Sequence, residues 1–167
     1  MKTLIPLLGA GLTAALLVPA TAPAHAADGN RRSVAASARF STLPTTGYRL
    51  SAKFGQRGSL WSSGRHTGLD FSAPRGRKVR AVADGRVVHA GWAGAYGKAV
   101  LVKHPSGKRS LYAHLSAIAV RKGQKVRSGQ RLGKVGSTGN TTGPHLHFEV
   151  RSKHGKKLDP RPYLRGE

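Results

Sequence analysis

Hydrophobic and polar residues alternate with a period of two over several short stretches of the chain, and turns rich in glycine separate these stretches. Such alternation is typical of half-buried β-strands, and a short continuous apolar run suits a strand buried on both faces. No stretch of about 12 residues has the period of an amphipathic helix. We therefore predict an all-β, mainly antiparallel fold, a compact sheet or sandwich with strands in the ranges 78–82, 85–89, 99–102, 109–115 and 144–151.

The N-terminal segment has the three parts of a secretory signal peptide. Lys2 gives a positive start, Leu4–Val18 is almost wholly apolar, and small residues lead to the cleavage pattern Ala24-His25-Ala26. The apolar run is shorter than the roughly 20 residues that span a bilayer. We predict a signal peptide over residues 1–26 and a mature protein that is secreted, extracellular or associated with the cell wall, without stable membrane insertion.

The segment after the predicted cleavage site has a different composition from the rest. Residues 27–46 are rich in Ala, Ser, Thr and Arg and show neither a helical nor a strand period. We interpret them as a linker or a short N-terminal arm, which could still lie in a groove of the protein. The β-like pattern begins at Gly47, so residues 47–167 are predicted to form one domain, which we expect to be monomeric.

Composition narrows the partners of this domain. The chain of 167 residues has 29 Lys and Arg against 6 Asp and Glu, which gives a formal charge of +23. A protein this basic is attracted to polyanions such as nucleic acid, an anionic membrane or an anionic cell wall. Export favours the cell envelope, so we expect no nucleic-acid partner. The absence of cysteine excludes disulfide scaffolds, Cys-ligated zinc modules and thiol enzymes.

The candidate chemistry lies in three short motifs that contain histidine. His66 and Asp70 form one motif, His114 lies in a second, and His145 and His147 lie two apart in a predicted strand, where their side chains share a face. Each motif alone is weak evidence. Together, two histidines and one aspartate match a catalytic zinc site that keeps a fourth position for water. The two remaining histidines could position water and stabilise a developing oxyanion. Spacing does not decide which of His145 and His147 would bind the metal.

These motifs and their flanking residues resemble the M23 metallopeptidases, the lysostaphin/LytM-type endopeptidases of bacterial peptidoglycan. The resemblance extends over residues 47–164, nearly all of the predicted mature chain. Several stretches agree in order along the chain, which makes a chance match implausible. The matching stretches are 54–55, 66–74, 83–87, 96–97, 112–115, 129–133, 136–139, 142–150 and 159–164.

The resemblance assigns roles to particular residues of this chain. It implies that His66, Asp70 and His147 are zinc ligands and that His114 and His145 are the catalytic pair. It also implies a long substrate groove with an antiparallel sheet as its floor and loops as its walls. The family does not use the position of Glu149 as a general base, so we interpret that residue as lying on the strand surface or supporting a metal ligand.

By this resemblance the protein is expected to be a secreted zinc metalloendopeptidase that hydrolyses peptide bonds in bacterial peptidoglycan, either in stem peptides or in cross-bridges. Its charge is expected to add attraction to anionic wall polymers. Two alternatives stay open: a catalytically idle wall-binding or amidase-activating module, and a secreted polyanion-binding protein. The idle relatives typically lack zinc ligands, and none is missing here. His89, His104 and His154 match no ligand position, and we interpret them as structural or surface residues.

Overall fold

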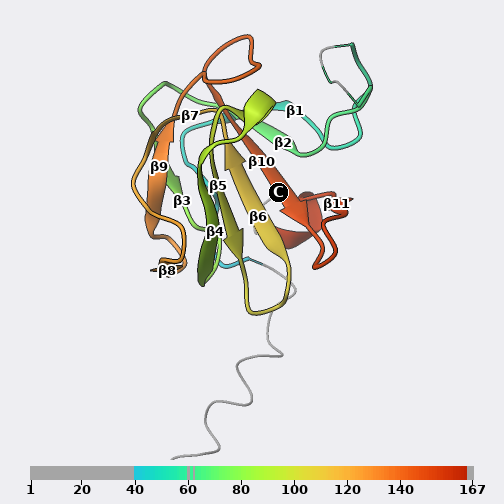
Figure 1. Ribbon diagram of the computed structural model, residues 1–167. Coiled ribbons are helices and arrows are strands. Elements are labelled where there is room, and N and C mark those ends of the chain that lie inside the picture. Colours follow the sequence, from blue (N-terminus) through green and yellow to red (C-terminus); the bar gives the residue numbers. More distant parts are fainter. Residues whose placement is uncertain (1–39, 60, 62, 165–167) are drawn as a thin grey trace, which may run out of the picture.

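Two antiparallel β-sheets and two short 3-10 helices make up the described part of the chain, which confirms the predicted all-β class (Figure 1). The computed structural model describes residues 40–59, 61 and 63–164. The predicted signal peptide and residues 27–39 of the predicted arm lie outside these residues. None of the described helices is long and apolar enough to cross a membrane.

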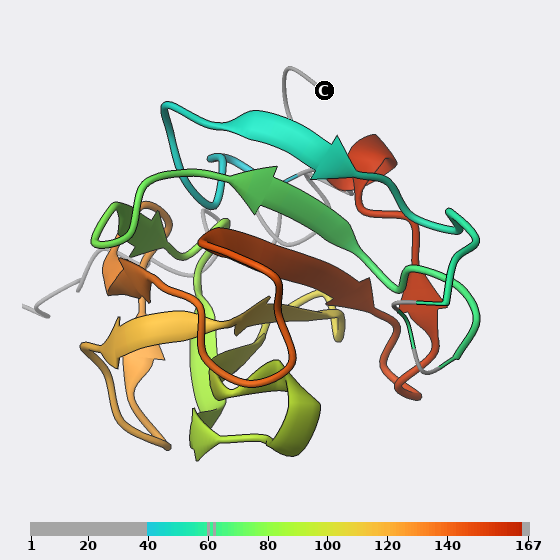
Figure 2. The same ribbon diagram turned by 90° about the horizontal axis from the view of Figure 1, so that it is seen from above.

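The larger sheet carries the strand with the His-x-His motif near its middle. Figure 2 shows β1, β2 and β10 side by side, in cyan, green and dark red. All strand pairs recorded between described residues are antiparallel. The spatial order is β1 (Arg49–Ala52), β2 (Leu69–Ser72), β10 (His145–Arg151), β6 (Arg109–Ala113), β5 (Lys98–Lys103), β4 (Gly85–Trp92) and β8 (Lys125–Val126), and β11 (Lys157–Leu158) also pairs with β10.

The smaller sheet lies against one face of the larger one. Its strands, in spatial order, are β3 (Lys78–Arg80), β9 (Arg131–Val135) and β7 (Leu115–Ile118). Alternate residues of both sheets point between them and form the main hydrophobic core, as the period-two pattern predicts. The core includes Phe71, Tyr112 and Phe148 from the larger sheet and Val79 and Leu132 from the smaller, all without measurable exposure.

The described end of the predicted arm packs on this core. Phe40 is buried, its ring lies against Tyr163 of the helix η2 (Arg161–Tyr163), and its N–H donates to the carbonyl of Tyr163. The hydroxyl of Thr45, which is also buried, donates to the carbonyl of Lys78 in β3. Residues 40–46 are therefore attached to the domain from which the sequence pattern had separated them.

One predicted strand is divided in the structure. The range 109–115 forms β6 up to Ala113, and Leu115 begins β7 in the other sheet. His114 stands between them with φ of 59°, the one positive φ among described residues other than glycine. This left-handed conformation costs a non-glycine residue about 1–2 kcal/mol. Period-two alternation could not reveal the break, because the apolar pattern continues across it.

Candidate metal and catalytic site

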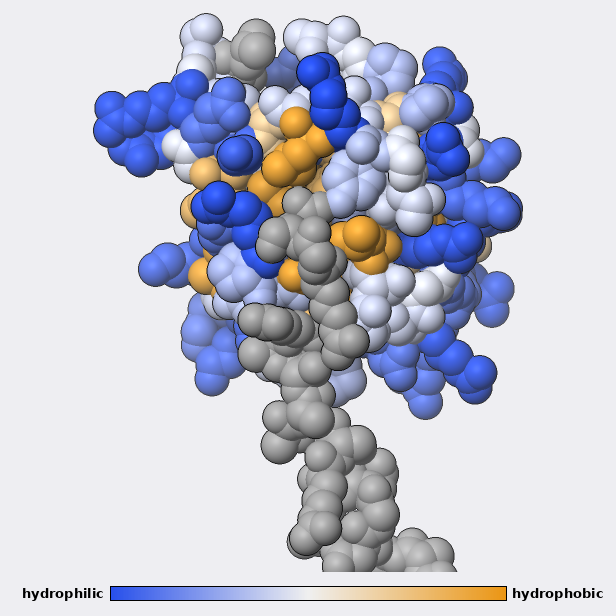
Figure 3. Space-filling view, turned by 180° about the vertical axis from the view of Figure 1, so that it is seen from behind, coloured by the Kyte–Doolittle hydropathy of each residue, from blue (hydrophilic) through white to orange (hydrophobic). Residues whose placement is uncertain are grey.

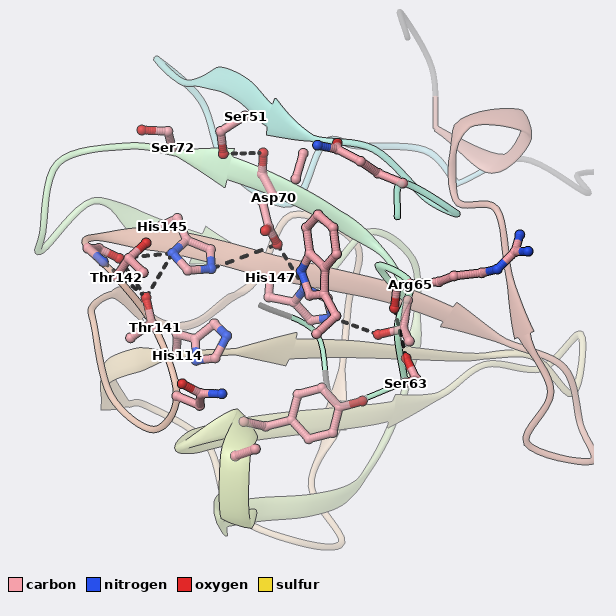
Figure 4. Close-up of a pocket in the computed structure, with 18 of the residues that line it drawn as sticks. Ser51, Ser63, Arg65, Asp70, Ser72, His114, Thr141, Thr142, His145 and His147 are labelled. Carbon is pink, nitrogen blue, oxygen red and sulfur yellow. Dashed lines mark hydrogen bonds and ion pairs between the residues drawn. The ribbon is translucent and has the colours of Figure 1, made fainter. Parts of the chain in front are cut away.

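A pocket of about 580 Å³ lies over β2 and β10, where the predicted site residues meet. Asp70, His114, His145 and His147 line it, and loop residues 140–144 form part of its wall (Figure 4). The glycine-rich stretch before β10 thus contributes a wall loop. Trp61 covers another side, with its ring 5.0 Å from that of the buried His66, centroid to centroid.

Strand pairing brings together the three side chains with metal-ligand chemistry. Asp70 in β2 is directly opposite His147 in β10. His66 precedes β2 and is anchored by backbone hydrogen bonds to residues 55 and 56. The Oδ1 atom of Asp70 lies 3.0 Å from Nε2 of His66 and 2.8 Å from Nδ1 of His147, and the two nitrogens are 3.0 Å apart. Three donor atoms therefore converge on one point.

This triangle of donors fits a zinc ion. Four-coordinate zinc bound to nitrogen and oxygen at about 2.0–2.1 Å holds its ligand atoms about 3.3 Å apart, so a small outward shift would accommodate it. Among the described residues, His66, Asp70 and His147 are the group of histidine and acidic side chains able to hold a metal ion in this way. Two imidazoles and one carboxylate are a donor set typical of catalytic zinc.

Hydrogen bonds fix which nitrogen of each ligand-type histidine is bare. Nδ1 of His66 lies 3.1 Å from the carbonyl of Lys53, and because a carbonyl only accepts, Nδ1 carries the proton and Nε2 is free. Nε2 of His147 lies 3.2 Å from the carboxylate of Glu149, to which it donates, so Nδ1 faces Asp70. Both bare nitrogens belong to the converging triangle, which is the arrangement a metal requires.

The electrostatics of the triangle favour a cation. Burial raises the pKa of Asp70, but hydrogen bonds and charge from His147 and His66 outweigh burial and hold that pKa well below its usual range. Burial lowers the pKa of His147, but Asp70 and Glu149 outweigh it and leave the pKa raised. The site therefore combines an ionised carboxylate with a tendency to hold a proton, and a metal ion binds in place of such a proton.

His114 and His145 form a second pair beside the triangle. Their rings are 4.7 Å apart, centroid to centroid, and Nε2 of His145 is 3.8 Å from Oδ1 of Asp70. Nδ1 of His145 donates to the carbonyl of Gly143 at 2.9 Å, and Nδ1 of His114 donates to that of Thr138 at 2.8 Å. Each ring therefore keeps Nε2 unprotonated in its neutral form.

Close backbone packing holds His114 in its unusual conformation. Its N–H donates to the carbonyl of Tyr96, at the end of the helix η1 (Gly94–Tyr96). Gly97 and Gly139 approach so closely that a side-chain carbon on either would overlap the other segment's backbone.

Burial lowers the pKa of His114 to about 4, although its hydrogen bond to Thr138 favours the charged form. His114 is therefore a neutral imidazole at neutral pH.

Glu149 has a larger part in the site than the sequence indicated. Its side chain is fully buried, so of the two positions expected for it the strand surface is excluded, and support of a ligand-type histidine agrees with the structure. Period two places it on the same face as His147, and Oε1 accepts from His147, from the hydroxyl of Thr67 at 2.5 Å and from that of Tyr96 at 2.7 Å. Oε2 accepts from Arg151 at 2.6 and 2.7 Å. The spacing of two residues between His147 and Glu149 was the one feature of the sequence that could have indicated this position. No feature of the sequence indicated that Thr67, Tyr96 and Arg151 would contact Glu149.

The pKa of Glu149 agrees with this role. Burial raises it, but hydrogen bonds from His147 and Thr67 and the charges of His147 and Arg151 outweigh burial and lower it to about 2. Glu149 therefore remains ionised, accepts the Nε2 proton of His147 and keeps Nδ1 of that ring directed at Asp70. A carboxylate that orients a ligand histidine in this way also raises the basicity of that ligand.

The remaining histidines lie outside the site. His104 is buried in the turn after β5, His154 is exposed, and His89 is half-buried in β4. None of the three lines the pocket. The structural or surface interpretation of these residues agrees with their positions.

Comparisons with known proteins identify related chains. Residues 64–160 match the sequence profile described as Peptidase family M23. The chain is 46% identical over 123 residues to the DD-carboxypeptidase/endopeptidase Mpg of Neisseria meningitidis serogroup B, a match that covers 72% of this chain and 28% of Mpg. It is 39% identical over 150 residues to the murein hydrolase activator NlpD of Salmonella typhimurium, covering 87% of this chain and 38% of NlpD.

A solved structure shares the fold as well. The catalytic domain of the antimicrobial peptidase lysostaphin from Staphylococcus simulans superimposes with a TM-score of 0.65 and 35% sequence identity, covering 69% of this chain and 90% of that domain. The curated relatives are longer: the chain spans about a third of the length of Mpg and NlpD. The similarity therefore concerns the domain that contains the pocket.

Proposed function

This chain belongs to peptidase family M23, and from that premise we propose that it is a secreted zinc endopeptidase that hydrolyses peptide bonds in bacterial peptidoglycan. The observation that carries the proposal is the convergence of five side chains at one site: His66, Asp70 and His147 form the triangle of donors, and His114 and His145 lie beside it. All of them except the buried His66 line the pocket. Similarity to a DD-carboxypeptidase/endopeptidase, to a murein hydrolase activator and to the antimicrobial peptidase lysostaphin supports this substrate class.

We propose that His66, Asp70 and His147 hold the zinc ion. When bound, zinc in such a donor set supplies Lewis-acid activation of a water molecule and of an amide carbonyl. Glu149 orients His147 for this purpose through the Nε2–H hydrogen bond. Lys53 orients His66 in the same way with its backbone carbonyl. Both ligands are thus positioned before metal binds, which limits the reorganisation that binding requires.

His114 and His145 are proposed to move protons during amide hydrolysis. Each is anchored through Nδ1–H to a backbone carbonyl, so its bare Nε2 can accept a proton from the attacking water. The same Nε2, once protonated, can donate to the developing oxyanion or to the departing amine. Because burial keeps His114 neutral at neutral pH, it is ready to act as an acceptor at the start of the cycle.

The proposal includes the location of the protein. Residues 1–26 would direct export, and the mature chain would act on peptidoglycan outside the cytoplasm as a monomer. Similarity to a relative named as a murein hydrolase activator supports an envelope location.

Digestion of purified peptidoglycan tests the proposal. Zinc-loaded wild-type protein is expected to release new amino groups and peptide fragments, whose masses identify the bond that is cut. Chelation should abolish release, added zinc should restore it, and His147→Ala should abolish it permanently. His154→Ala, which changes an exposed histidine outside the pocket, is the matched control and should retain activity. Equal release by chelated and zinc-loaded protein would exclude a zinc-dependent mechanism.

A second candidate is activation of a separate murein hydrolase, which the similarity to NlpD favours. It predicts that the protein alone releases no fragments, but raises the release produced by an added amidase. The presence of all five side chains at the site favours hydrolysis by the chain itself. The same digestion, run with and without an amidase, separates the two functions.

A further inference from the structure

Six basic residues lie side by side across the larger sheet. Each is directly opposite the next on the neighbouring strand, so the pairs run from β8 through β4, β5, β6 and β10 to β11. We call this set the basic row; its members, in spatial order, are Lys125, Arg86, Lys103, Arg109, Arg151 and Lys157. In Figure 1 the row crosses the lower end of the sheet, where the β5–β6 hairpin turns.

The basic row lies on the face of the sheet that carries the catalytic pocket. On β10, period two places Arg151 on the same face as His145, His147 and Glu149, while Val150 points into the core. Four residues along a strand correspond to about 13 Å, so Arg151 lies roughly that distance from His147 along β10. Lys157, the last member of the row, also lines the pocket. The row and the pocket are therefore continuous.

The positive charge of the row is largely uncompensated. Glu149 is the acidic residue beside it, and its carboxylate is 2.6 Å from Arg151 and 3.9 Å from Lys157. Among the described residues, no ion pair is formed by Arg86, Lys103, Arg109 or Lys125. Like charges directly opposite each other in neighbouring strands destabilise a sheet. A bound polyanion would remove that repulsion.

The turns at this end of the sheet carry further positive charge. Basic residues occupy the β5–β6 turn, the segment before β8 and the β10–β11 turn: Lys108, Arg121, Lys122, Lys153 and Lys156. The first and third of these turns are adjacent, because a side-chain carbon on Gly107 would contact that of Lys153. They extend the positive surface around the row.

We propose that the basic row binds an extended phosphate-bearing polymer of the bacterial wall and holds the enzyme beside the peptidoglycan to which that polymer is attached. The proposal rests on the proposed function for its choice of partner. Six strands at a spacing of about 4.8 Å make the row about 24 Å long, which suits a linear polyanion and not a single small anion. Continuity with the pocket places the bound polymer next to the peptide to be cut.

Other polyanions fit the row less well. Proteins that hold single-stranded nucleic acid combine positive charge with aromatic side chains that stack on bases. The ring recorded against a member of the row is that of Tyr96, which Arg151 covers at 5.6 Å and whose hydroxyl donates to Glu149. A membrane surface is bound more firmly where large apolar side chains project beside the charge. Among the described residues, Trp92 is the large apolar side chain that is exposed, and it lies at the opposite end of β4 from Arg86. It is therefore not placed beside the row.

Basic side chains alone would not distinguish the row, because they occur over much of the surface. Figure 3, which shows the opposite side from Figure 1, has hydrophilic residues projecting on both sides of the molecule. The test therefore compares two triple variants of the full chain that lose equal charge from exposed strand positions. The row variant carries Arg86→Gln, Lys103→Gln and Lys125→Gln, and the control variant carries Lys78→Gln, Arg131→Gln and Lys134→Gln in the smaller sheet.

Binding is measured to insoluble cell walls that carry phosphate polymers, and to the same walls after acid extraction of these polymers. A chelator is present, so cleavage does not alter the walls and the result does not depend on the proposed activity. The row variant is expected to bind intact walls about tenfold more weakly than wild type, with a shallower salt dependence. The control variant should remain within about threefold of wild type, and extraction should remove the difference between the variants.

Equal losses by the two variants would overturn the proposal, because net charge alone would then explain binding. The proposal would also be overturned if the two variants differed as much in binding to extracted walls as to intact walls. The same holds if the row variant lost binding only to single-stranded DNA or to anionic lipid vesicles. Arg109 and Arg151 are left unchanged because the Nε of Arg109 is buried and Arg151 holds Glu149. Thermal unfolding shows whether both variants are folded. If the row variant does not fold, the single variant Lys103→Gln takes its place.

Discussion

The buried His104 and the histidines of the pocket differ in how their ring nitrogens are used. His104 has both nitrogens occupied: Nδ1 donates to the carbonyl of Asp84 at 2.8 Å, and Nε2 lies 2.8 Å from the hydroxyl of Ser110. That hydroxyl is hydrogen-bonded to Tyr112, which accepts from the N–H of Val82. The chain of hydrogen bonds is closed, so His104 has no free group to offer a ligand.

The histidines of the pocket are held equally firmly but through one nitrogen only. His66, His114 and His145 each donate Nδ1–H to a backbone carbonyl, and His147 donates Nε2–H to Glu149. The other nitrogen of each is bare and belongs to the triangle or to the pair beside it. The difference teaches that burial does not mark a functional histidine; a fixed tautomer with one uncommitted nitrogen does.

The largest expected effect of a substitution is on hydrolysis. It should follow a change in the pocket and not a change at His104. Asp70→Asn keeps the shape of the side chain but removes the charge at the centre of the triangle. We expect peptidoglycan hydrolysis to fall about a thousandfold or more, because metal binding and the position of both histidine ligands are lost together. His104→Asn should keep hydrolysis per folded molecule within about threefold of wild type. A comparable loss in both variants would mean that the distinction between the groups is wrong.

Metal-linked stability is the next largest effect. A ligand that binds only the folded state at a hundred times its dissociation constant adds about 2.7 kcal/mol to the free energy of unfolding. Zinc at that excess should therefore raise the unfolding midpoint of wild type and of His104→Asn, but not that of Asp70→Asn. Calorimetry with and without a chelator measures the difference. A zinc effect that persists in Asp70→Asn would place the metal elsewhere in the chain.

Glu149→Gln tests how much the orientation of one nitrogen contributes. The amide preserves the size of the side chain but weakens its hydrogen bond with the Nε2–H of His147 and its pairing with Arg151. We expect zinc affinity to fall about 10- to 100-fold, measured by competition with a chromogenic chelator. Asp159→Asn, which changes a carboxylate that is paired with Arg161 and does not line the pocket, is the matched control. Unchanged affinity in Glu149→Gln would reduce Glu149 to a packing residue.

The sequence predicts some parts of this arrangement well. Period two in residues 144–151 correctly places His145, His147 and Glu149 on one face and their apolar neighbours in the core. Alternation and turns also predict the all-β class, because strand periodicity is a local property of the chain. The boundaries are less certain: β4 extends to Trp92, beyond the predicted end at His89.

Other parts depend on contacts between distant residues, which no local pattern contains. The left-handed conformation of His114 is set by the carbonyl of Tyr96 and the close approach of Gly97 and Gly139. The carboxylate of Glu149 is satisfied in its buried position partly by Thr67 and Tyr96, which come from two segments distant in sequence. A resemblance could propose ligands, but the bare nitrogen of each histidine required the tertiary structure.

The smallest expected effect concerns the pH dependence of stability at His104. Burial lowers the pKa of this residue, although hydrogen bonding to Asp84 and its charge favour the protonated form. The unfolded chain therefore takes up a proton near pH 6.5, before the folded protein does. The contribution of neutral His104 to the free energy of unfolding is fully present above about pH 6.5. It is lost as the pH falls from there towards the lower pKa of the folded protein, by at most about 1.4 kcal/mol per pH unit.

His104→Asn should remove that part of the pH dependence, because asparagine can still donate to the carbonyl of Asp84 but does not titrate. Chemical denaturation at several pH values between about 7 and 5 measures the slope, which should be shallower in His104→Asn than in wild type. His154→Asn, at an exposed position, removes a histidine without this burial and should keep the slope of wild type. Each variant differs from wild type at one position, so the contributions of all other groups cancel in the comparison. An unchanged slope in His104→Asn would show that the hydrogen bonds around His104 in the wild type do not prevent its protonation. Electrostatics would then no longer distinguish His104 from the histidines of the pocket.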